Sequence, residues 1–396
     1  MYNTIIIGAG PVGSYLAAKL AQLGYKVLVL DKKVAAGQDI CCTGIIGKEC
    51  LNLLAINNNL IIRQANSARF FAPSGKPLRL WREDEVAYII DRPALDQVLA
   101  TRAQATGAYY LFNAQVIDIQ VGADCLRVKA DYCGQNKSFE AETAVIATGF
   151  GSPLPRKVDL GKINDFIVGA QAEVNINGVD EVEVYFDQTL APGGFAWLVP
   201  KRDSKGLAGL MTHQQPEYHL NKLLSNLKAQ DKIASTEVVP RYGAIPLRPL
   251  PRTYADRILV VGEAAGQVKP STGGGIYYGL LCADIAADSL HQAFLVNNFS
   301  KSRLASYQKQ WRARLDKELQ IDYWAHRLYG RLSNQQIERL HNFVDNNGIP
   351  QLITELESFS FDWHGELILK TLKHLAASIP SQAIKALSRH NATTSD

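Results

Sequence analysis

The chain has 396 residues, of which 47% are hydrophobic and 20% are charged, and its formal net charge at pH 7 is +4. The length favours two domains over one, and the composition excludes an intrinsically disordered chain. The mild charge, with no segment that interleaves Lys and Arg with aromatic residues, argues against nucleic-acid binding.

The expected secondary structure begins with a strand, a helix and a second strand within the first thirty residues. Strand patterns dominate residues 165–248, and helical patterns dominate residues 300–396. We expect helices at residues 11–23, 92–106 and 276–290, and a short antiparallel excursion at 63–86. The expected strands are at residues 3–8, 26–30, 109–119, 143–147, 166–174, 181–186, 195–199 and 257–261.

A glycine-rich turn lies between the first strand and the first helix. Residues 8–13 read GAGPVG, which fits the GxGxxG pattern, and Asp31 ends the second strand. Gly8 permits the tight turn, Gly10 lets the backbone approach a pyrophosphate, and Gly13 allows the helix to pack closely on the strand. The helix N-terminus offers N–H groups to phosphates, and Asp31 accepts hydrogen bonds from ribose hydroxyls. This context predicts a dinucleotide site; a βα turn without a ligand is the less favoured interpretation.

A second signature, more than two hundred residues later, favours FAD over NAD. Residues 257–276 read RILVVGEAAGQVKPSTGGGI, in which a strand ends at Gly262 and Glu263 and three glycines open a helix. A carboxylate at this point suits ribityl hydroxyls, and the positive helix end suits the pyrimidine edge of a flavin, where the reduced form carries negative charge. A simple NAD enzyme has no use for this arrangement. A glycine-rich hinge before a core helix is the competing interpretation.

These signatures predict an α/β fold with a discontinuous FAD-binding domain, whose sheet is parallel and Rossmann-type, like that of glutathione reductase. We expect an antiparallel β-sheet domain for the substrate to be inserted into it, followed by a C-terminal helical region. The FAD-binding domain comprises residues 1–62, 87–150 and 253–295, the substrate domain 63–86 and 151–252, and the helical region 296–396.

The sequence resembles the geranylgeranyl reductases, which are FAD enzymes with the aromatic-hydroxylase fold. The resemblance covers about the first 295 residues and rests most on GEAAGQVKPSTGGGIYYG, which is similar to the family's GDAAGxxxPxxGGGI pattern. Supporting segments are DRPALDQVLA (91–100), IATG (146–149), CCTG (41–44) and GGFAWLVP (193–200), the last similar to the family's YxWxFP segment along the lipid pocket. Glu263 replaces the family's Asp, and Phe195 and Val199 replace Tyr and Phe.

The resemblance implies which residues contact FAD and which line the substrate pocket. For Arg92 and for the aromatic strand near Trp197, a surface arginine and simple core packing are the competing interpretations. The expected pocket residues are Phe195, Trp197 and Pro200. The expected FAD-binding residues are Gly8, Gly10, Pro11, Val12, Gly13, Asp31, Lys32, Cys41, Cys42, Gly44, Arg92, Val116, Ala147, Thr148, Gly149, Gly262, Glu263, Pro270, Gly273, Gly274, Gly275 and Ile276.

Cys41 and Cys42 are the candidate catalytic residues. In this fold the loop that carries them passes near the isoalloxazine ring, where a thiol can protonate one alkene carbon while reduced flavin delivers hydride to its neighbour. The competing interpretation is that both are small buried hydrophobic groups. The histidines show no spacing typical of metal ligands, and no metal site is expected.

The spacing of the cysteines and the hydropathy of the chain indicate its cellular compartment. The six cysteines form no CxxC pair and no dense framework, which is typical of a reducing cytosol. We recognise no secretory signal and no apolar window of about 20 residues, so we expect a cytoplasmic protein with at most peripheral membrane contact. Residues 367–387 interleave apolar and basic residues; a solvated helix face is slightly favoured over basic amphipathic helices on an anionic bilayer.

The combined prediction is a reductase that uses FAD to saturate carbon–carbon double bonds of an isoprenoid chain. Its electron donor is external, and NAD(P)H, ferredoxin and quinol all remain open, because no second GxGxxG motif marks a standing nicotinamide site. One alternative is a flavin monooxygenase or dehydrogenase of the same fold. Another is a non-enzymatic escort protein that binds prenyl groups, although the intact glycine turns argue against it.

Overall fold

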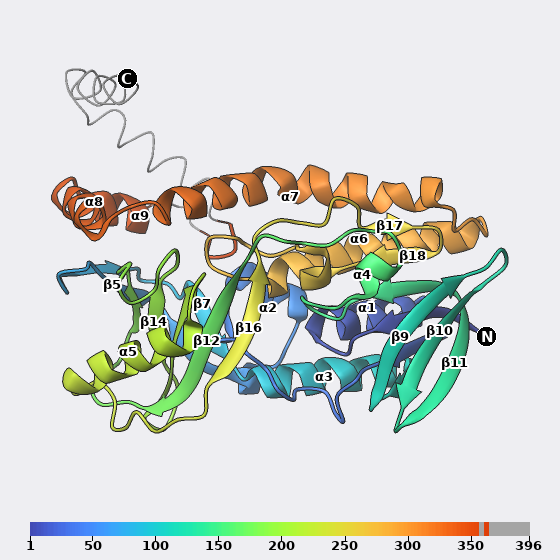
Figure 1. Ribbon diagram of the computed structural model, residues 1–396, viewed down its shortest axis with the longest axis horizontal. Coiled ribbons are helices and arrows are strands. Elements are labelled where there is room, and N and C mark those ends of the chain that lie inside the picture. Colours follow the sequence, from blue (N-terminus) through green and yellow to red (C-terminus); the bar gives the residue numbers. More distant parts are fainter. Residues whose placement is uncertain (356–359, 364–396) are drawn as a thin grey trace, which may run out of the picture.

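The protein was analysed as a computed structural model that describes residues 1–355 and 360–363. It contains two large sheets, a small three-stranded sheet and a helical layer that runs across both large sheets (Figure 1). The basic segment at 367–387, for which two interpretations were weighed, lies outside the described residues.

The first sheet has eight strands and carries the predicted βαβ unit. Parallel strands β8 (Tyr109–Leu111), β2 (Val27–Leu30), β1 (Tyr2–Ile7), β11 (Gln135–Ile146) and β18 (Ile258–Val260) form its centre, and β17 (Tyr254–Ala255) closes one edge. These strands are apolar because helices cover them: α1 (Pro11–Gln22) packs between α3 (Arg92–Ala105) and α6 (Ile276–Leu295). Strand β18 pairs in register with β11, with Leu259 beside Val145, which confirms the predicted return to the first sheet.

A β-hairpin extends this sheet beyond the predicted strands. The strand-like segment expected at 109–119 is formed but is divided, because Asn113 adopts a left-handed φ of 54° between β8 and β9 (Ala114–Val121). Strand β10 (Leu126–Tyr132) then pairs with β9 and with the long β11, of which only the last third was expected. Cys133 and Gly134, both with positive φ, form the tight turn that the strand pattern did not indicate.

The second sheet has seven strands in the order β16 (Arg241–Pro246), β12 (Phe166–Asn175), β15 (Lys205–Thr212), β14 (Ala196–Pro200), β13 (Val182–Tyr185), β5 (Ser67–Phe71) and β6 (Pro77–Trp81). It is antiparallel except where β13 runs parallel to β5. Strands dominate residues 165–248 as expected, but the expectation did not include α5 (Pro216–Ala229), which buries Leu220, Leu223, Leu224 and Leu227 against this sheet.

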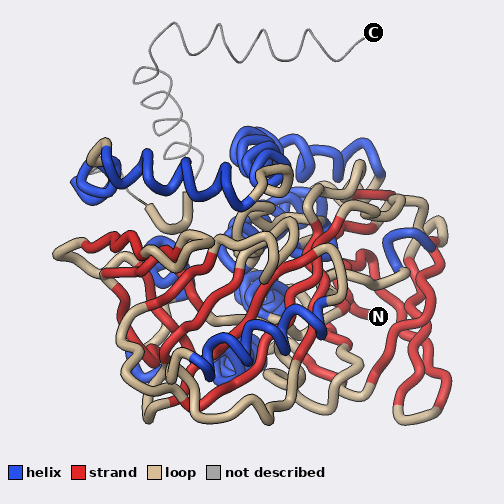
Figure 2. Tube along the Cα trace, turned by 60° about the vertical axis from the view of Figure 1, so that its left-hand side comes forward, coloured by secondary structure: helices blue, strands red, loops and turns tan. Residues whose placement is uncertain are grey.

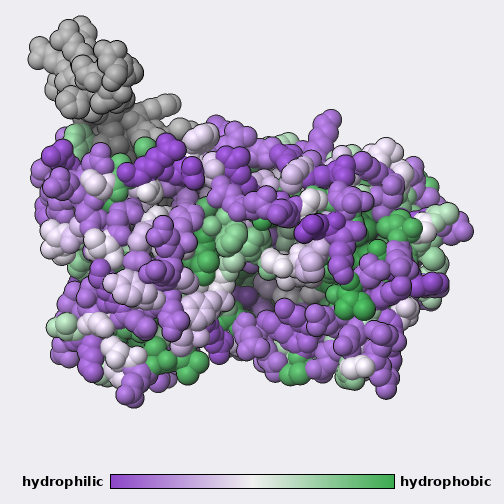
Figure 3. Space-filling model, in the orientation of Figure 1, coloured by the Kyte–Doolittle hydropathy of each residue, from purple (hydrophilic) through white to green (hydrophobic). Residues whose placement is uncertain are grey.

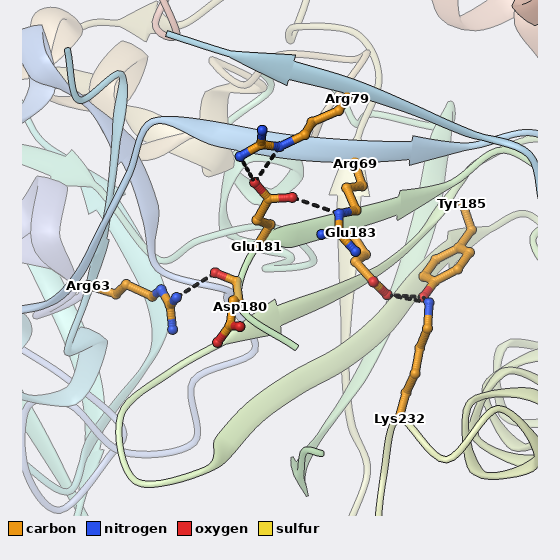
Figure 4. Close-up of polar contacts among 8 residues, drawn as sticks. All are labelled: Arg63, Arg69, Arg79, Asp180, Glu181, Glu183, Tyr185 and Lys232. Atoms are coloured by element: carbon orange, nitrogen blue, oxygen red, sulfur yellow. Dashed lines mark hydrogen bonds and ion pairs between the residues drawn. The ribbon is translucent and has the colours of Figure 1, made fainter. Parts of the chain in front are cut away.

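Ion pairs join the two parts of the second sheet that are far apart in sequence. Glu181 binds Arg69 at 2.7 Å and Arg79 at 2.6 Å, which ties β5 and β6 to the start of β13 (Figure 4). Glu183, buried on β13, accepts hydrogen bonds from the Tyr185 hydroxyl and, at 2.8 Å, from Lys232 Nζ. These contacts account for the insertion of the 67–81 hairpin at this edge.

The remaining elements are short or helical. A three-stranded sheet of β3 (Ile45–Gly47), β7 (Ala87–Ile90) and β4 (Ile61–Ala65) lies beside α2 (Lys48–Leu54). Single turns are formed by η1 (Asn58–Leu60), α4 (Leu154–Lys157) and η2 (Gly262–Ala265). The C-terminal helices are α7 (Lys301–Tyr329), α8 (Asn334–Asn346) and α9 (Ile349–Glu355), and Figure 2 shows them from a second side.

Helix α7 connects the two large sheets. Near its start, Trp311 Nε1 donates to Thr253 Oγ1 at 3.0 Å and Tyr307 Oη donates to the Val260 carbonyl at 3.0 Å, both at the first sheet. Near its end, Tyr323 packs with Met211 of the second sheet. The helix therefore fixes one sheet relative to the other along its length (Figure 1).

Candidate functional site

The turn between β1 and α1 has the geometry of an anion site. Gly8 has a φ of 116°, and a Cβ atom there would overlap the Ala147 carbonyl oxygen. A Cβ on Gly13 would overlap the Gly8 carbonyl oxygen, whereas one on Gly10 would meet no described atom within 4 Å. The turn is therefore tightly packed on its inner side and open at Gly10, the residue that caps α1. This opening fits a pyrophosphate at the positive end of the helix.

Asp31 stands at the end of β2, beside this turn. Its Oδ2 accepts a hydrogen bond from the Ala9 amide at 2.6 Å, and its Oδ1 accepts one from the Lys33 amide at 2.8 Å. Both bonds orient the carboxylate without using all of its acceptor sites. The position fits a ribose, as the sequence predicted, while Lys32 is exposed.

The glycines and carboxylate of the second signature meet the first signature in space. Val12 of α1 lies against Gly262 and Gly279, close enough that a Cβ on either glycine would press on its methyl groups. Glu263 lies between two glycine segments: a Cβ on Gly275 would be 3.2 Å from its Oε1, and one on Gly149 would be 4.0 Å from its Oε2. Burial raises the pKa of Glu263, and Arg92 opposes this rise. Segments around residues 12, 149 and 263–275 thus converge on one region.

Arg92 begins α3 and is buried. Asp91 caps the helix by accepting a hydrogen bond from the Ala94 amide at 3.0 Å, and Arg92 Nη1 binds Asp96 at 2.6 Å. Its Nε has no hydrogen-bond partner among the described residues. A Cβ on Gly44 would lie 3.0 Å from Arg92 Cγ, which places the CCTG loop over this arginine. The surface interpretation of Arg92 is wrong, because only 8% of the residue is exposed.

Both candidate catalytic thiols are half-buried beside the same region. Cys41 Sγ lies 3.6 Å from the Arg241 carbonyl oxygen of β16, and Cys42 Sγ lies 3.4 Å from the Gly44 amide. Burial, Cys42 and Glu263 raise the pKa of Cys41 to about 11, and Arg241 opposes this rise. The Cys41 sulfur therefore keeps its proton at neutral pH and suits an acid better than a nucleophile.

An apolar cluster adjoins the glycine loop that precedes α6. Phe195 and Trp197 pack against a small core that includes Met211 and Ile245. A Cβ on Gly273 would lie 3.0 Å from Ile245 Cδ1 and 3.3 Å from Met211 Sδ. These two side chains, called the apolar wall below, therefore contact the loop. Figure 3 shows a hollow near the middle of this face of the molecule, with apolar residues beside it.

The other predicted residues differ in how near they lie to this region. Ala147 and Thr148 follow β11 and border Gly8, and Ile276 begins α6. Val116 lies on β9 and packs against a hydrophobic cluster that includes strand residues of the first sheet. Pro200 ends β14 opposite Gly206, away from the aromatic pair at the start of that strand. The sequence did not indicate Met211, Ile245 or Tyr323 of the apolar cluster, since they come from three separate elements.

Comparisons with known proteins agree with this arrangement. A pyridine nucleotide-disulphide oxidoreductase family model matches residues 2–183. A digeranylgeranylglycerophospholipid reductase of Methanocaldococcus jannaschii is 26% identical over 86% of this chain and 90% of its own. A second protein with that name, from Methanopyrus kandleri, is 28% identical over 96% and 97%. The crystal structure of a geranylgeranyl bacteriochlorophyll reductase-like protein from Thermoplasma acidophilum covers 98% of both chains, with a TM-score of 0.83 and 23% identity.

Among residues 1–355 and 360–363, no helix is both long and apolar enough to cross a membrane. Within the same residues, His, Cys, Asp and Glu side chains form no group of three or more that could hold a metal ion.

Proposed function

Because this chain is an FAD-dependent oxidoreductase that is similar over most of its length to digeranylgeranylglycerophospholipid reductases, we propose that it saturates carbon–carbon double bonds in an isoprenoid chain. The observation that carries the proposal is the contact between the glycine loop at Gly273 and the apolar wall of Met211 and Ile245. This contact brings the expected flavin-binding loop to a surface that suits a hydrocarbon and not a polar substrate.

The chain contributes binding and proton chemistry to this reaction. Bound FAD, once reduced, supplies a hydride. The N-terminus of α1 and Asp31 would hold its pyrophosphate and ribose, while Glu263 and Gly275 would hold the flavin half. Cys41 carries a proton at neutral pH and lies beside Glu263, so it can serve as an acid toward a substrate carbon. The apolar wall excludes water, which protects the hydride from competing reactions.

The partner molecules follow from the same proposal. An external donor, which is NAD(P)H, ferredoxin or a quinol, reduces the flavin. The substrate is a prenyl lipid, which the protein reaches from the aqueous side through peripheral membrane contact.

Anaerobic reoxidation tests the proposed function. We expect protein reduced with dithionite to be reoxidised by a lipid with geranylgeranyl chains, and the lipid to gain two hydrogens for each double bond reduced. A fully saturated lipid with the same headgroup is the matched control and leaves the flavin reduced. Reoxidation by dioxygen with oxygenation of a substrate would instead identify a monooxygenase, and a colourless protein that binds prenyl lipids would identify an escort.

Replacement of Cys41 by Ser tests the acid within the same assay. We expect the C41S variant to bind FAD but to be reoxidised by the lipid at least about 10-fold more slowly, since general acid catalysis contributes about 100-fold or more. C125S is the control, because Cys125 lies in the β9–β10 turn. Equal rates for wild type and C41S would remove Cys41 from the mechanism.

A further inference from the structure

A buried polar cluster adjoins the glycine loop that precedes α6. It consists of Asp322 on α7, Lys269 and Ser271 in the loop, and Tyr278 on α6; Asp322 and Tyr278 are 0% exposed and Lys269 is 3% exposed. Neither carboxylate oxygen of Asp322 has a hydrogen-bond partner among the described residues, and the same holds for Ser271 Oγ and Tyr278 Oη. Such groups are costly inside a protein unless they have a function.

The charges around Asp322 come from three elements. From the loop, the Lys269 ammonium and the Ser271 hydroxyl favour its ionised form, whereas Glu318 on its own helix opposes that form. Tyr278 faces it from α6 as a neutral phenol, because burial raises the Tyr278 pKa. Burial outweighs the favourable groups and raises the pKa of Asp322 to about 6. Asp322 therefore exchanges its proton close to neutral pH.

Lys269 is held by a segment near the end of the described chain. Its Nζ donates to the Phe361 carbonyl oxygen at 2.9 Å. The next residue, Asp362, is also buried and accepts hydrogen bonds from the amides of Gly47 at 3.3 Å and Cys50 at 3.0 Å. Lys269 Nζ therefore has an acceptor other than Asp322, and no Lys269–Asp322 ion pair is among the contacts of the described residues.

The glycine loop contributes residues to the polar cluster and also contacts the apolar wall. The loop is closed by hydrogen bonds from the Gly273 amide to the Lys269 carbonyl at 2.8 Å and from the Lys269 amide to the Gly274 carbonyl at 3.1 Å. Ser271 lies within it, two residues before Gly273, which touches the wall. Tyr323, the residue after Asp322, belongs to the apolar cluster. Two adjacent residues of α7, Asp322 and Tyr323, thus belong to the polar cluster and to the apolar cluster, respectively.

We propose that Asp322 is a proton-positioning residue that takes up a proton when the cofactor is reduced and releases it through the Ser271 hydroxyl when a double bond is saturated. Negative charge on the reduced cofactor favours protonation of a nearby carboxylate. Saturation adds one hydride, with its electron pair, to one alkene carbon and one proton to the other. That proton comes either from Cys41 or from this relay. In the relay, the Ser271 hydroxyl gives its proton toward the substrate side and receives one from Asp322, which is left as a carboxylate near Lys269 until the next reduction of the cofactor favours its reprotonation by solvent. The release step rests on the proposed function.

The pH dependence of the flavin midpoint potential tests proton uptake without any lipid. We expect the plot of flavin midpoint potential against pH for the wild-type holoprotein to change slope near pH 6, the pKa of Asp322. The D322N variant keeps the side-chain size but cannot titrate, so this change of slope disappears. D316N, six residues earlier on α7 and partly exposed, is the matched control and retains it. The same change of slope in D322N as in wild type would overturn the proposal.

Anaerobic reoxidation by a geranylgeranyl lipid tests proton release. We expect D322N and S271A to react at least about 10-fold more slowly than wild type and D316N, with a pH profile that no longer changes near pH 6. Wild-type rates and profiles in both variants would overturn the relay. If wild type itself does not react with the lipid but its potential shows a change of slope that D322N lacks, the proposed substrate is wrong and proton uptake by Asp322 stands.

Discussion

Replacement of the buried Asp322 by Asn has a predicted effect on stability whose sign depends on pH. The pKa of Asp322 is about 6 in the folded protein and 3.8 in its reference state. A raised pKa means that the folded state binds the proton more tightly, so the carboxylate form costs stability at high pH and this cost vanishes as pH falls toward 4. The difference of about two pH units between the two pKa values corresponds to about 3 kcal/mol.

The free energy of unfolding in urea measures this effect. We expect D322N to gain stability relative to wild type by about 2.5 kcal/mol when the comparison moves from pH 4 to pH 8, with most of the change between pH 4 and 6. A constant cost of the new buried amide cancels from this comparison because it does not titrate. D316N, whose side chain is 33% exposed, should follow wild type at every pH. A difference between D322N and wild type that is the same at both pH values would refute the reasoning.

Three further substitutions test the site and the fold. Gly13→Ala places a Cβ on the Gly8 carbonyl oxygen, so we expect the purified protein to lack flavin absorbance; a full complement of flavin would contradict the assigned packing. Asp31→Ala removes the acceptor of the Ala9 amide, and titration of the apoprotein should show FAD affinity reduced at least about 10-fold, as expected for a lost bond to a charged group. Leu223→Ala, in the fully buried face of α5, should lower the free energy of unfolding by about 2–5 kcal/mol while flavin content is unchanged; loss of flavin would show that the second sheet is coupled to the site.

The predictions from sequence were most accurate where residues close together in the chain determine the local structure. The unit from β1 to β2 is marked by an apolar strand, a glycine turn and a helix that begins at Pro11, all within thirty residues. Helix α5 was missed although Leu220, Leu223, Leu224 and Leu227 have helical spacing, because the flanking strands dominated the interpretation of that region. The turn at Cys133 and Gly134 was missed for a different reason: its left-handed Cys is unusual for a hairpin.

Much of the candidate site depends on contacts that no local pattern encodes. Glu263 and the glycine loop were predictable from their motif, but Arg92, Gly149 and Gly275 meet around Glu263 only because the first sheet brings three crossovers to one edge. Asp322 had a local signal, since it shares a buried helical face with Leu315, Leu319 and His326. Its meeting with Ser271 did not, because fifty residues of α6 and α7 lie between them and the packing of the two helices decides the contact.

Helix α7 gives a physical reason why a buried acid and an apolar cluster can adjoin the same loop. A carboxylic acid needs polar neighbours, whereas a hydrocarbon site must exclude them, and a single loop of small residues adjoins both environments. Because α7 packs on the first sheet through Tyr307 and Trp311 and on the second through Tyr323, it sets the position of Asp322 from both sides. Because α7 holds the acid next to the loop, a proton that leaves Asp322 for the substrate side passes through the Ser271 hydroxyl, which the loop itself provides.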